Sequence, residues 1–313
     1  MDLISLVIPC YNEEEAIPLF YDEMMRVMPE ISGAEVEMIF VNDGSSDKTL
    51  AILREYAKAD SRVKFLSFSR NFGKEAAMLA GLSAAKGDYV GIIDADLQDP
   101  PSLLPEMYRI LKEDGYDNVA TKRADRKGEP PIRSFFANQY YKLINKISHT
   151  KMVPGARDYR LMNRKMTDAV LSLCEYNRFT KGIFEWVGFN TKWLEYKNIE
   201  RSAGKTKFSF WKLFKYSLES IIAFSTTPLA IASVFGILFF FVSIIGIIAV
   251  IVRYFMGVGS VSGWASQICV ILFVSGIQLF TIGIIGQYLA KTYLETKKRP
   301  IYIVSETEKD NRQ

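Results

Sequence analysis

Two aspartates and a glutamine, Asp94, Asp96 and Gln98, directly follow an apolar run from Tyr89 to Ile93. A short apolar run of this kind is typical of a buried parallel strand. Because side chains alternate along an extended chain, these three are expected to lie on one face. Their oxygen atoms suit a hard cation such as Mg²⁺ or Mn²⁺, which keeps positions open for water and phosphate. The alternative interpretation is a solvated acidic turn that caps the next helix.

Strands and helices alternate along the chain before this motif. Strands are expected at residues 3–8, 35–41 and 63–67. Helices are expected after them, at residues 13–28, about 47–59 and 75–85. This alternation predicts an α/β domain with a mostly parallel, doubly wound sheet, in which ligands bind beyond the carboxyl ends of the strands. Polar residues follow three of those ends, at residues 9–13, 42–44 and 94–96.

Residues after the acidic motif are less regular and more basic. A helix is expected at residues 133–147, and a strand is expected after the turn at Gly155. Residues 208–224 carry apolar side chains at helical spacing, with Lys212 and Lys215 on the other face, which indicates an amphipathic helix at a membrane interface. A helix packed on the soluble domain is the alternative.

Two stretches of the C-terminal third, 220–252 and 254–290, carry no charged residue. Each exceeds the ~20 residues that cross ~30 Å of hydrocarbon, so spans are predicted at about 227–252 and 265–290. Basic residues flank both outer ends of this hairpin, at positions 205, 207, 212, 215, 291, 297, 298 and 299. By the positive-inside rule, the large domain and both termini are expected in the cytoplasm of a multi-pass membrane protein.

The predicted organisation has four parts. They are a catalytic domain at 1–207, the amphipathic helix at 208–224, a transmembrane hairpin at 225–292 and a cytoplasmic tail at 293–313. The three cysteines lack metal-ligand spacing, which fits a reducing compartment. No signal peptide is expected, because the apolar stretch at 3–8 is too short and is followed at once by Pro9 and an acidic trio. No nucleic-acid partner is expected, and the net charge of +4 is modest. The lipid bilayer is an expected partner, and a homo-oligomer through the hairpin is left open.

Three motifs together resemble a known family. Residues 7–13 (Val-Ile-Pro-Cys-Tyr-Asn-Glu), 41–47 (Val-Asn-Asp-Gly-Ser-Ser-Asp) and 94–100 (Asp-Ala-Asp-Leu-Gln-Asp-Pro) resemble the family 2 glycosyltransferases with a GT-A fold. The similarity is strongest to the polyprenyl-phosphate branch, which includes dolichol-phosphate mannosyltransferases. Bacterial members of the bactoprenol glucosyltransferase type have two C-terminal transmembrane helices, as expected here.

The resemblance implies roles for the residues of these motifs. The nucleotide pocket would contain Pro9, Tyr11, Glu13, Asp43 and Asp94. A carboxylate such as that of Asp43 can accept a ring N–H from uracil or from guanine, so it does not decide between UDP and GDP. The metal would be Mg²⁺ or Mn²⁺ on Asp94, Asp96 and Gln98, where it would offset the diphosphate charge.

The resemblance also implies residues for catalysis and for phosphate binding. Basic residues facing the donor diphosphate or the acceptor phosphate would be Arg123, Arg133, Arg201 and Lys207. Asp158 and Asp96 are the catalytic candidates. Because a phosphate monoester is mostly ionised near neutral pH, Asp158 can orient the phosphate or the sugar instead of taking a proton. The loop Gly-Lys-Thr-Lys-Phe at 204–208 departs from the family's usual Glu-Ser-Lys-Tyr after the glycine, which leaves its detailed role open.

These implications predict an inverting hexosyltransferase. It would move a hexose from UDP-glucose or UDP-N-acetylglucosamine to polyprenyl (undecaprenyl) phosphate, for modification of a cell-envelope glycan. The alternatives are transfer of a modified sugar such as formamido-arabinose, transfer of mannose from GDP-mannose, and a catalytically idle membrane scaffold. A processive polysaccharide synthase is disfavoured, because two spans form little channel and no Gln-x-x-Arg-Trp signature is present.

Overall fold

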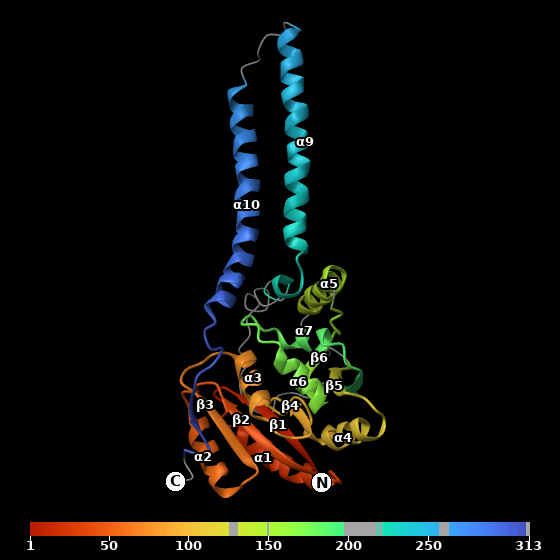
Figure 1. The fold of residues 1–313 in the computed structure, drawn as a ribbon, viewed down its shortest axis with the longest axis vertical. Helices are drawn as coiled ribbons and strands as arrows, with labels where there is room; N and C mark the ends of the chain where they lie inside the picture. Colours follow the sequence, from red (N-terminus) through yellow and green to blue (C-terminus); the bar gives the residue numbers. More distant parts are fainter. Residues whose placement is uncertain are drawn as a thin grey trace.

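An α/β domain carries two long projecting helices (Figure 1). The structure is a computed structural model that describes residues 1–124, 131–148, 150–196, 217, 219, 221–256 and 263–310. Most of the predicted amphipathic helix at 208–224 lies outside these described residues, as do Arg201 and Lys207.

An eight-stranded mixed sheet forms the centre of the domain, in the order β7-β5-β6-β4-β1-β2-β3-β8. Its strands are β1 (Asp2–Cys10), β2 (Ala34–Asn42), β3 (Val63–Phe68), β4 (Tyr89–Ile92), β5 (Asn118–Arg123), β6 (Ala156–Asn163), β7 (Thr191–Tyr196) and β8 (Val304–Thr307). The neighbours β4, β1, β2 and β3 run parallel, which confirms the predicted parallel core. Strand β6 is antiparallel to both β4 and β5.

Helices cover both faces of this sheet. They are α1 (Ala16–Val27), α2 (Thr49–Ala59), α3 (Lys74–Ala84), α4 (Leu104–Glu113), α5 (Pro131–Ile147), α6 (Arg164–Ser172) and α7 (Thr180–Trp186). Two short 3₁₀ turns, η1 (Met28–Glu30) and η2 (Pro101–Leu103), complete the domain. The helices expected at 13–28, 47–59, 75–85 and 133–147 are thereby confirmed, with ends shifted by a few residues.

Alternation along the central strands produces two apolar cores. On β1, Ile4, Leu6 and Ile8 contribute to the core on the side of α1, α2 and α4, whereas Val7 contributes to the other core, with α3, α6 and α7. Each large apolar side chain that is fully buried in this way stabilises the fold by about 1.5–3 kcal/mol. A Cβ atom at Gly81 of α3 would lie 2.1 Å from Cγ1 of Val7, so α3 packs at a distance that glycine permits.

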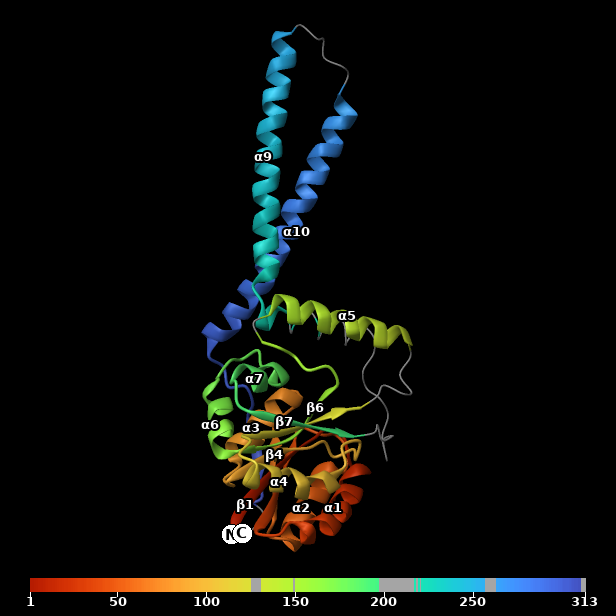
Figure 2. The same cartoon turned by 90° about the vertical axis from the view of Figure 1, so that its right-hand side faces the viewer.

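The projecting helices are α9 (Thr227–Phe255) and α10 (Trp264–Lys297). Both are long and apolar enough to cross a membrane. Their large side chains are exposed, as with Phe240 at 60% and Leu279 at 70%, so protein does not cover this apolar surface. Helix α5 lies crosswise between the sheet and the base of these helices (Figure 2). Ser225 and Thr227, at the start of α9, donate hydroxyl hydrogen bonds to the carbonyl of Ile147 at the end of α5.

After α10 the chain returns to the sheet. Strand β8 pairs antiparallel with the edge strand β3, and the Arg54 guanidinium forms a two-point ion pair with Glu306 at 2.8 and 2.6 Å. Tyr302 stacks on Phe68 with ring centroids 5.1 Å apart. The segment at 293–313, predicted only as a tail, therefore contains a strand of the catalytic sheet. Both ends of the α9–α10 hairpin lie on the same side as this domain.

Candidate active site

The carboxyl ends of β1 and β2 are joined by a network of loop hydrogen bonds. Asn12, at a positive φ of 53°, accepts from the backbone N–H of Ser46 at 2.8 Å and donates its own N–H to Ser45 at 2.9 Å. The N–H of Glu13 donates to the Thr49 hydroxyl at 2.9 Å. These contacts hold the predicted nucleotide-binding loop at 9–13 against the loop after β2.

Asp43 at the end of β2 is buried and fixes the loop that leads into α3. Its two carboxylate oxygens accept the backbone N–H groups of Phe72 and Gly73 at 2.6 and 2.9 Å. Burial raises the pKa of the Asp43 carboxyl, while these two hydrogen bonds oppose that shift. Gly44 allows the approach, because it has a φ of 65° and a Cβ there would lie 2.4 Å from the Arg70 carbonyl carbon. A carboxylate has further lone pairs, so a base N–H can still be accepted here.

The acidic motif after β4 is a turn, which corrects the prediction of an extended chain. Strand β4 ends at Ile92, before Asp94, and Leu97 has a positive φ of 56°. Alternation of side chains across a strand therefore does not apply to Asp94, Asp96 and Gln98. The Asp96 carboxylate accepts the backbone N–H of Gln98 at 3.1 Å, a local bond that favours a turn over a strand.

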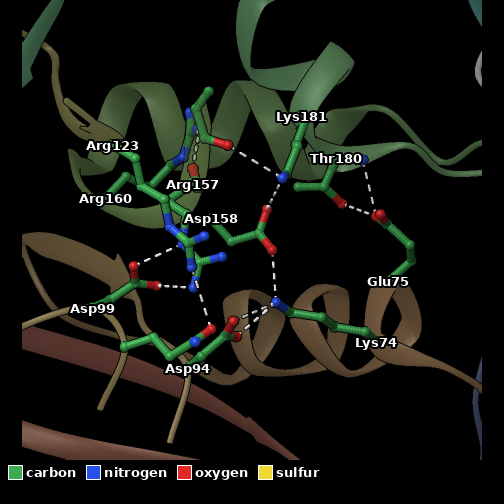
Figure 3. A network of polar contacts seen from close by, with 12 residues as sticks. Lys74, Glu75, Asp94, Asp99, Arg123, Arg157, Asp158, Arg160, Thr180 and Lys181 are labelled. Carbon is green, nitrogen blue, oxygen red and sulfur yellow. Dashed lines mark hydrogen bonds and ion pairs between the residues drawn. The ribbon is translucent and has the colours of Figure 1, made fainter. Parts of the chain in front are cut away.

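The ammonium group of Lys74, the first residue of α3, joins the turn after β4 to strand β6 (Figure 3). Its Nζ lies 2.6 Å from Oδ1 of Asp94 and 2.6 Å from Oδ2 of Asp158. Lys181 of α7 lies on the other side of Asp158, with Nζ 3.8 Å from Oδ1. In the antiparallel register Ile92 faces Arg160, and continuing it by two residues brings 94 opposite 158. Without Lys74 the two carboxylates would face each other across the strand ends.

Asp158 and Lys74 both keep their charges across the physiological pH range. Burial by itself would raise the pKa of Asp158, but Lys181 and Lys74 outweigh it and hold that pKa far below its ordinary value. Burial would lower the pKa of Lys74, yet Asp158 and Asp94 raise it well above the ordinary range. Asp158 is therefore a carboxylate of very low basicity, suited to orienting charged groups and poorly suited to removing a proton.

A second ion pair holds the turn that follows Asp96. Arg157 of β6 binds Asp99 through two nitrogens, at 2.8 and 3.2 Å, and the Tyr196 hydroxyl donates to the same carboxylate. Arg123 of β5 donates to the Gln98 side-chain oxygen at 3.3 Å. Cations from two strands thus surround the turn, which suits phosphate oxygens brought there by a substrate.

A family model described as Glycosyl transferase family 2 matches residues 5–171, which is more than half of the chain and includes the motifs at 7–13, 41–47 and 94–100. The chain belongs to glycosyltransferase family 2. This glycosyltransferase is also similar over nearly its whole length to curated relatives. It is 44% identical to the prophage bactoprenol glucosyl transferase homolog of Escherichia coli, over 98% of this chain and 99% of that protein.

Two further similarities extend the comparison. The glycosyltransferase is 42% identical to the SfII prophage-derived bactoprenol glucosyl transferase of Shigella flexneri, over 98% of this chain and 99% of that protein. Among solved structures, it is similar to glucosyl-3-phosphoglycerate synthase of Mycobacterium tuberculosis in complex with Mn²⁺ and UDP-glucose. That likeness has a TM-score of 0.46 and 19% identity, over 71% of this chain and 77% of that one.

The structure brings most of the predicted residues of this glycosyltransferase together where the carboxyl ends of the central parallel strands lie. Those at the ends of β1, β2, β4, β5 and β6 are Pro9, Tyr11, Glu13, Asp43, Asp94, Asp96, Gln98, Arg123 and Asp158. Arg133 belongs to the first turn of α5, and its side chain lies outside the described part of the chain, as do Arg201 and Lys207. The roles assigned to all of these residues remain predictions.

Sequence reasoning missed Lys74, Lys181 and Arg157, the cations in contact with Asp94, Asp158 and Asp99. Two of them offered a signal. Lys74 ends the basic loop Arg-Asn-Phe-Gly-Lys that enters α3 at the carboxyl end of β3, and Arg157 adjoins Asp158. Lys181 offered none, because only the packing of α7 against β6 brings it near Asp158.

The residues of the acidic turn fit a hard divalent ion in chemistry. They supply two carboxylates and an amide oxygen, and Asp94 already contacts a cation in the Lys74 ammonium. Within the described ranges no cluster of three or more His, Cys, Asp or Glu side chains forms a metal site. An ion on Asp94, Asp96 and Gln98 would therefore need water or substrate phosphates to complete its shell.

Proposed function

We propose that this glycosyltransferase moves a glucosyl group from UDP-glucose to a polyprenyl phosphate, with inversion at the anomeric carbon. One observation carries the proposal: the same chain contains a cluster of cations suited to binding phosphate and an exposed apolar hairpin. Full-length relatives at 42–44% identity that are named bactoprenol glucosyl transferases support the same acceptor. A soluble acceptor would not require the hairpin.

In this proposal the protein positions the donor and the acceptor and stabilises the charge that develops on the leaving group. An acceptor phosphate oxygen attacks the anomeric carbon, the bond from that carbon to the donor diphosphate breaks, and the nucleoside diphosphate leaves with the electron pair. Because the acceptor is already an anion near neutral pH, the protein need not supply a strong base. Asp158 would hold Lys74 and Lys181 in place, and these cations would face the phosphate groups.

A divalent ion is part of the proposal. Asp94, Asp96 and Gln98 would hold Mg²⁺ or Mn²⁺, which would offset the charge of the departing diphosphate. Pro9, Tyr11, Glu13 and Asp43 would line the nucleotide pocket next to it.

We also propose that the catalytic domain and both termini face the cytoplasm, where nucleotide sugars are made. Support comes from the basic residues on both outer flanks of the hairpin. Pairing of β8 with β3 supports the placement of the two flanks on one side of the membrane.

The experiment is a transfer assay with membranes that contain the protein. Given labelled UDP-glucose and added polyprenyl phosphate, they should form a chloroform-soluble product that mild acid hydrolyses, as expected for a glycosyl phosphate. The product should disappear when the polyprenyl phosphate is omitted. A panel of UDP-, GDP- and dTDP-sugars tests the donor, and label in protein or in a growing polysaccharide without lipid dependence would refute the proposal.

A further inference from the structure

A pocket of ≈ 180 Å³ lies beneath α5. Its walls are largely apolar and aromatic, from α5, the loop before β6, and the chain entering α7. They are Tyr140, Tyr141, Met152, Val153 and Phe179. The polar residues that reach this pocket are Arg160, Lys181 and Glu185.

Arg160 is the unusual member of the lining. It is 1% exposed, and its Nε and Nη1 atoms have no hydrogen-bond partner among the described residues. Nη2 makes one long hydrogen bond, of 3.4 Å, to the Arg157 carbonyl, and the guanidinium lies 3.6 Å from the centre of the Phe184 ring. Burial lowers the pKa of the Arg160 guanidinium to about 10, so it stays charged at neutral pH. A buried charge with unused donors is costly unless something pairs with it.

The pocket adjoins the catalytic cluster through Lys181. The Lys181 ammonium lies 3.8 Å from Asp158 and donates a hydrogen bond to the Ala156 carbonyl at 3.3 Å. Arg160 and Asp158 are two apart on β6, so their side chains leave the same face of that strand. Two carboxylates, Glu185 and Asp158, raise the pKa of Arg160, yet neither forms an ion pair with it in the described structure. An anion in the pocket would thus meet two cations beside the site of transfer.

The apolar side of the pocket is continuous with the base of the hairpin. Met152 and Phe179 form a small core with Ile144 of α5, and Phe224, just before α9, packs against it. Helix α5, which contributes Ile144 to this core, lies between the sheet and the base of the spans (Figure 2). A ligand reaching the pocket from the membrane would therefore bring its apolar part along aromatic walls and its charged end to Arg160 and Lys181.

We propose that this pocket binds the phosphate and the first isoprenoid unit of the acceptor lipid, with Arg160 and Lys181 as the phosphate ligands. The inference rests on the proposed function and names a subsite for it. The cavity volume of ≈ 180 Å³ suits a headgroup with a short branched segment and excludes a whole polyprenol. The remaining chain would lie in the bilayer along α9 and α10.

The test uses the full-length protein in detergent and farnesyl phosphate as the probe. Wild type should bind farnesyl phosphate at least ~10-fold more tightly than either farnesol or inorganic phosphate, since each lacks one half of the recognised chemistry. Arg160→Met should weaken farnesyl phosphate at least ~10-fold, as expected for lost charge-assisted hydrogen bonds, and should leave UDP affinity within about twofold. Replacement of an unpaired buried charge by an apolar side chain of similar length is compatible with folding.

Two more variants complete the design. Val153→Trp fills the pocket while keeping Arg160, so it should also lose farnesyl phosphate binding, and it decides the question if Arg160→Met does not fold. Arg109→Met is the matched control, because Arg109 is an exposed arginine on α4, paired with Glu113 at 3.2 Å. It should bind like wild type.

The outcomes separate the two proposals. If wild type transfers glucose to polyprenyl phosphate but folded Arg160→Met keeps the wild-type affinity and acceptor KM, the pocket assignment is wrong. Farnesol binding as tightly as farnesyl phosphate, or inorganic phosphate binding as tightly, would also overturn it. If wild type shows no transfer to any polyprenyl phosphate, the proposed function itself fails.

Discussion

Lys74 and Asp158 are in direct contact, with Nζ 2.6 Å from Oδ2, although 84 positions separate them in the sequence. The same ammonium contacts Asp94, so one side chain connects the proposed metal turn with the proposed catalytic carboxylate. This contact makes the two sites parts of one electrostatic unit. A change at Lys74 is expected to affect both.

Lys74→Gln should lower kcat/KM by roughly 10- to 150-fold, the loss expected for charge-assisted hydrogen bonds of about 1.5–3 kcal/mol. Asp158→Asn should also lower kcat/KM. The double variant should lose less kcat/KM than the product of the two single losses, because the residues act together. Lys86→Gln, at an exposed lysine just beyond the other end of α3, is the control and should keep full activity. Strictly multiplicative losses would contradict the coupling.

Asp96→Asn should reduce transfer by at least ~10²-fold, since it removes a charged ligand of the proposed ion. Calorimetry provides a readout independent of turnover. Mg²⁺ should strengthen UDP binding to wild type and should have little effect on the variant. Asp114→Asn, at an exposed position after α4, is expected to behave as wild type. Full activity of Asp96→Asn in chelator-treated membranes would refute the metal assignment.

The acid limb of the pH–rate profile should reflect protonation of the acceptor phosphate and not of Asp158. The pKa of Asp158 is held far below its ordinary value by Lys181 and Lys74, against the effect of burial, so Asp158 stays ionised as pH falls towards 5. A phosphate monoester instead takes up a proton near its second pKa of ~6 and becomes a poorer nucleophile. The rate should therefore fall as pH drops through about 6. An acceptor analogue with a more acidic difluoromethylphosphonate should move the limb to lower pH, and a limb that does not move would contradict this assignment.

Deletion of residues 300–313 should open the edge of the sheet at β3. Backbone amides of β3 should then exchange hydrogen faster, while those of β6, far from this edge, should change little. Equal protection of the β3 amides in the wild-type and the truncated protein would argue against a stabilising role for β8. Glu306→Gln alone should cost only about 0.2–1 kcal/mol of stability, because its partner Arg54 is partly exposed.

The topology proposal predicts which cysteines an impermeant reagent can reach from outside the cell. In a background with Cys174→Ser and Cys269→Ser, which leaves only the buried Cys10, Ser260→Cys should be labelled and Lys309→Cys should not. The reverse pattern would mean that the catalytic domain faces outward.

Local patterns were sufficient for the parallel core and for much of the site. The apolar runs of β1 to β4 and the polar residues that follow them predicted which residues meet at one sheet edge. The geometry of Asp94, Asp96 and Gln98 was predicted incorrectly, because Leu97 adopts a positive φ that no periodicity reveals. The basic loop that Lys74 ends was a signal for the site, but its contact with Asp158 was missed, because that contact depends on the antiparallel pairing of β6 with β4, which brings 158 opposite 94.

Strand β8 was missed for a related reason. Four residues after a long apolar helix carry little signal of their own, and only the free edge of β3 gives them a partner.

Strand β8 also has a consequence for the order of biosynthesis. Ribosomes complete β3 more than two hundred residues before they reach Val304, with both apolar helices in between. The edge of the sheet thus stays unpaired until the hairpin has been translated, and an open edge is a template for aggregation. A chain that stalls or fails to insert its hairpin correctly would retain this open edge, which marks it as incomplete.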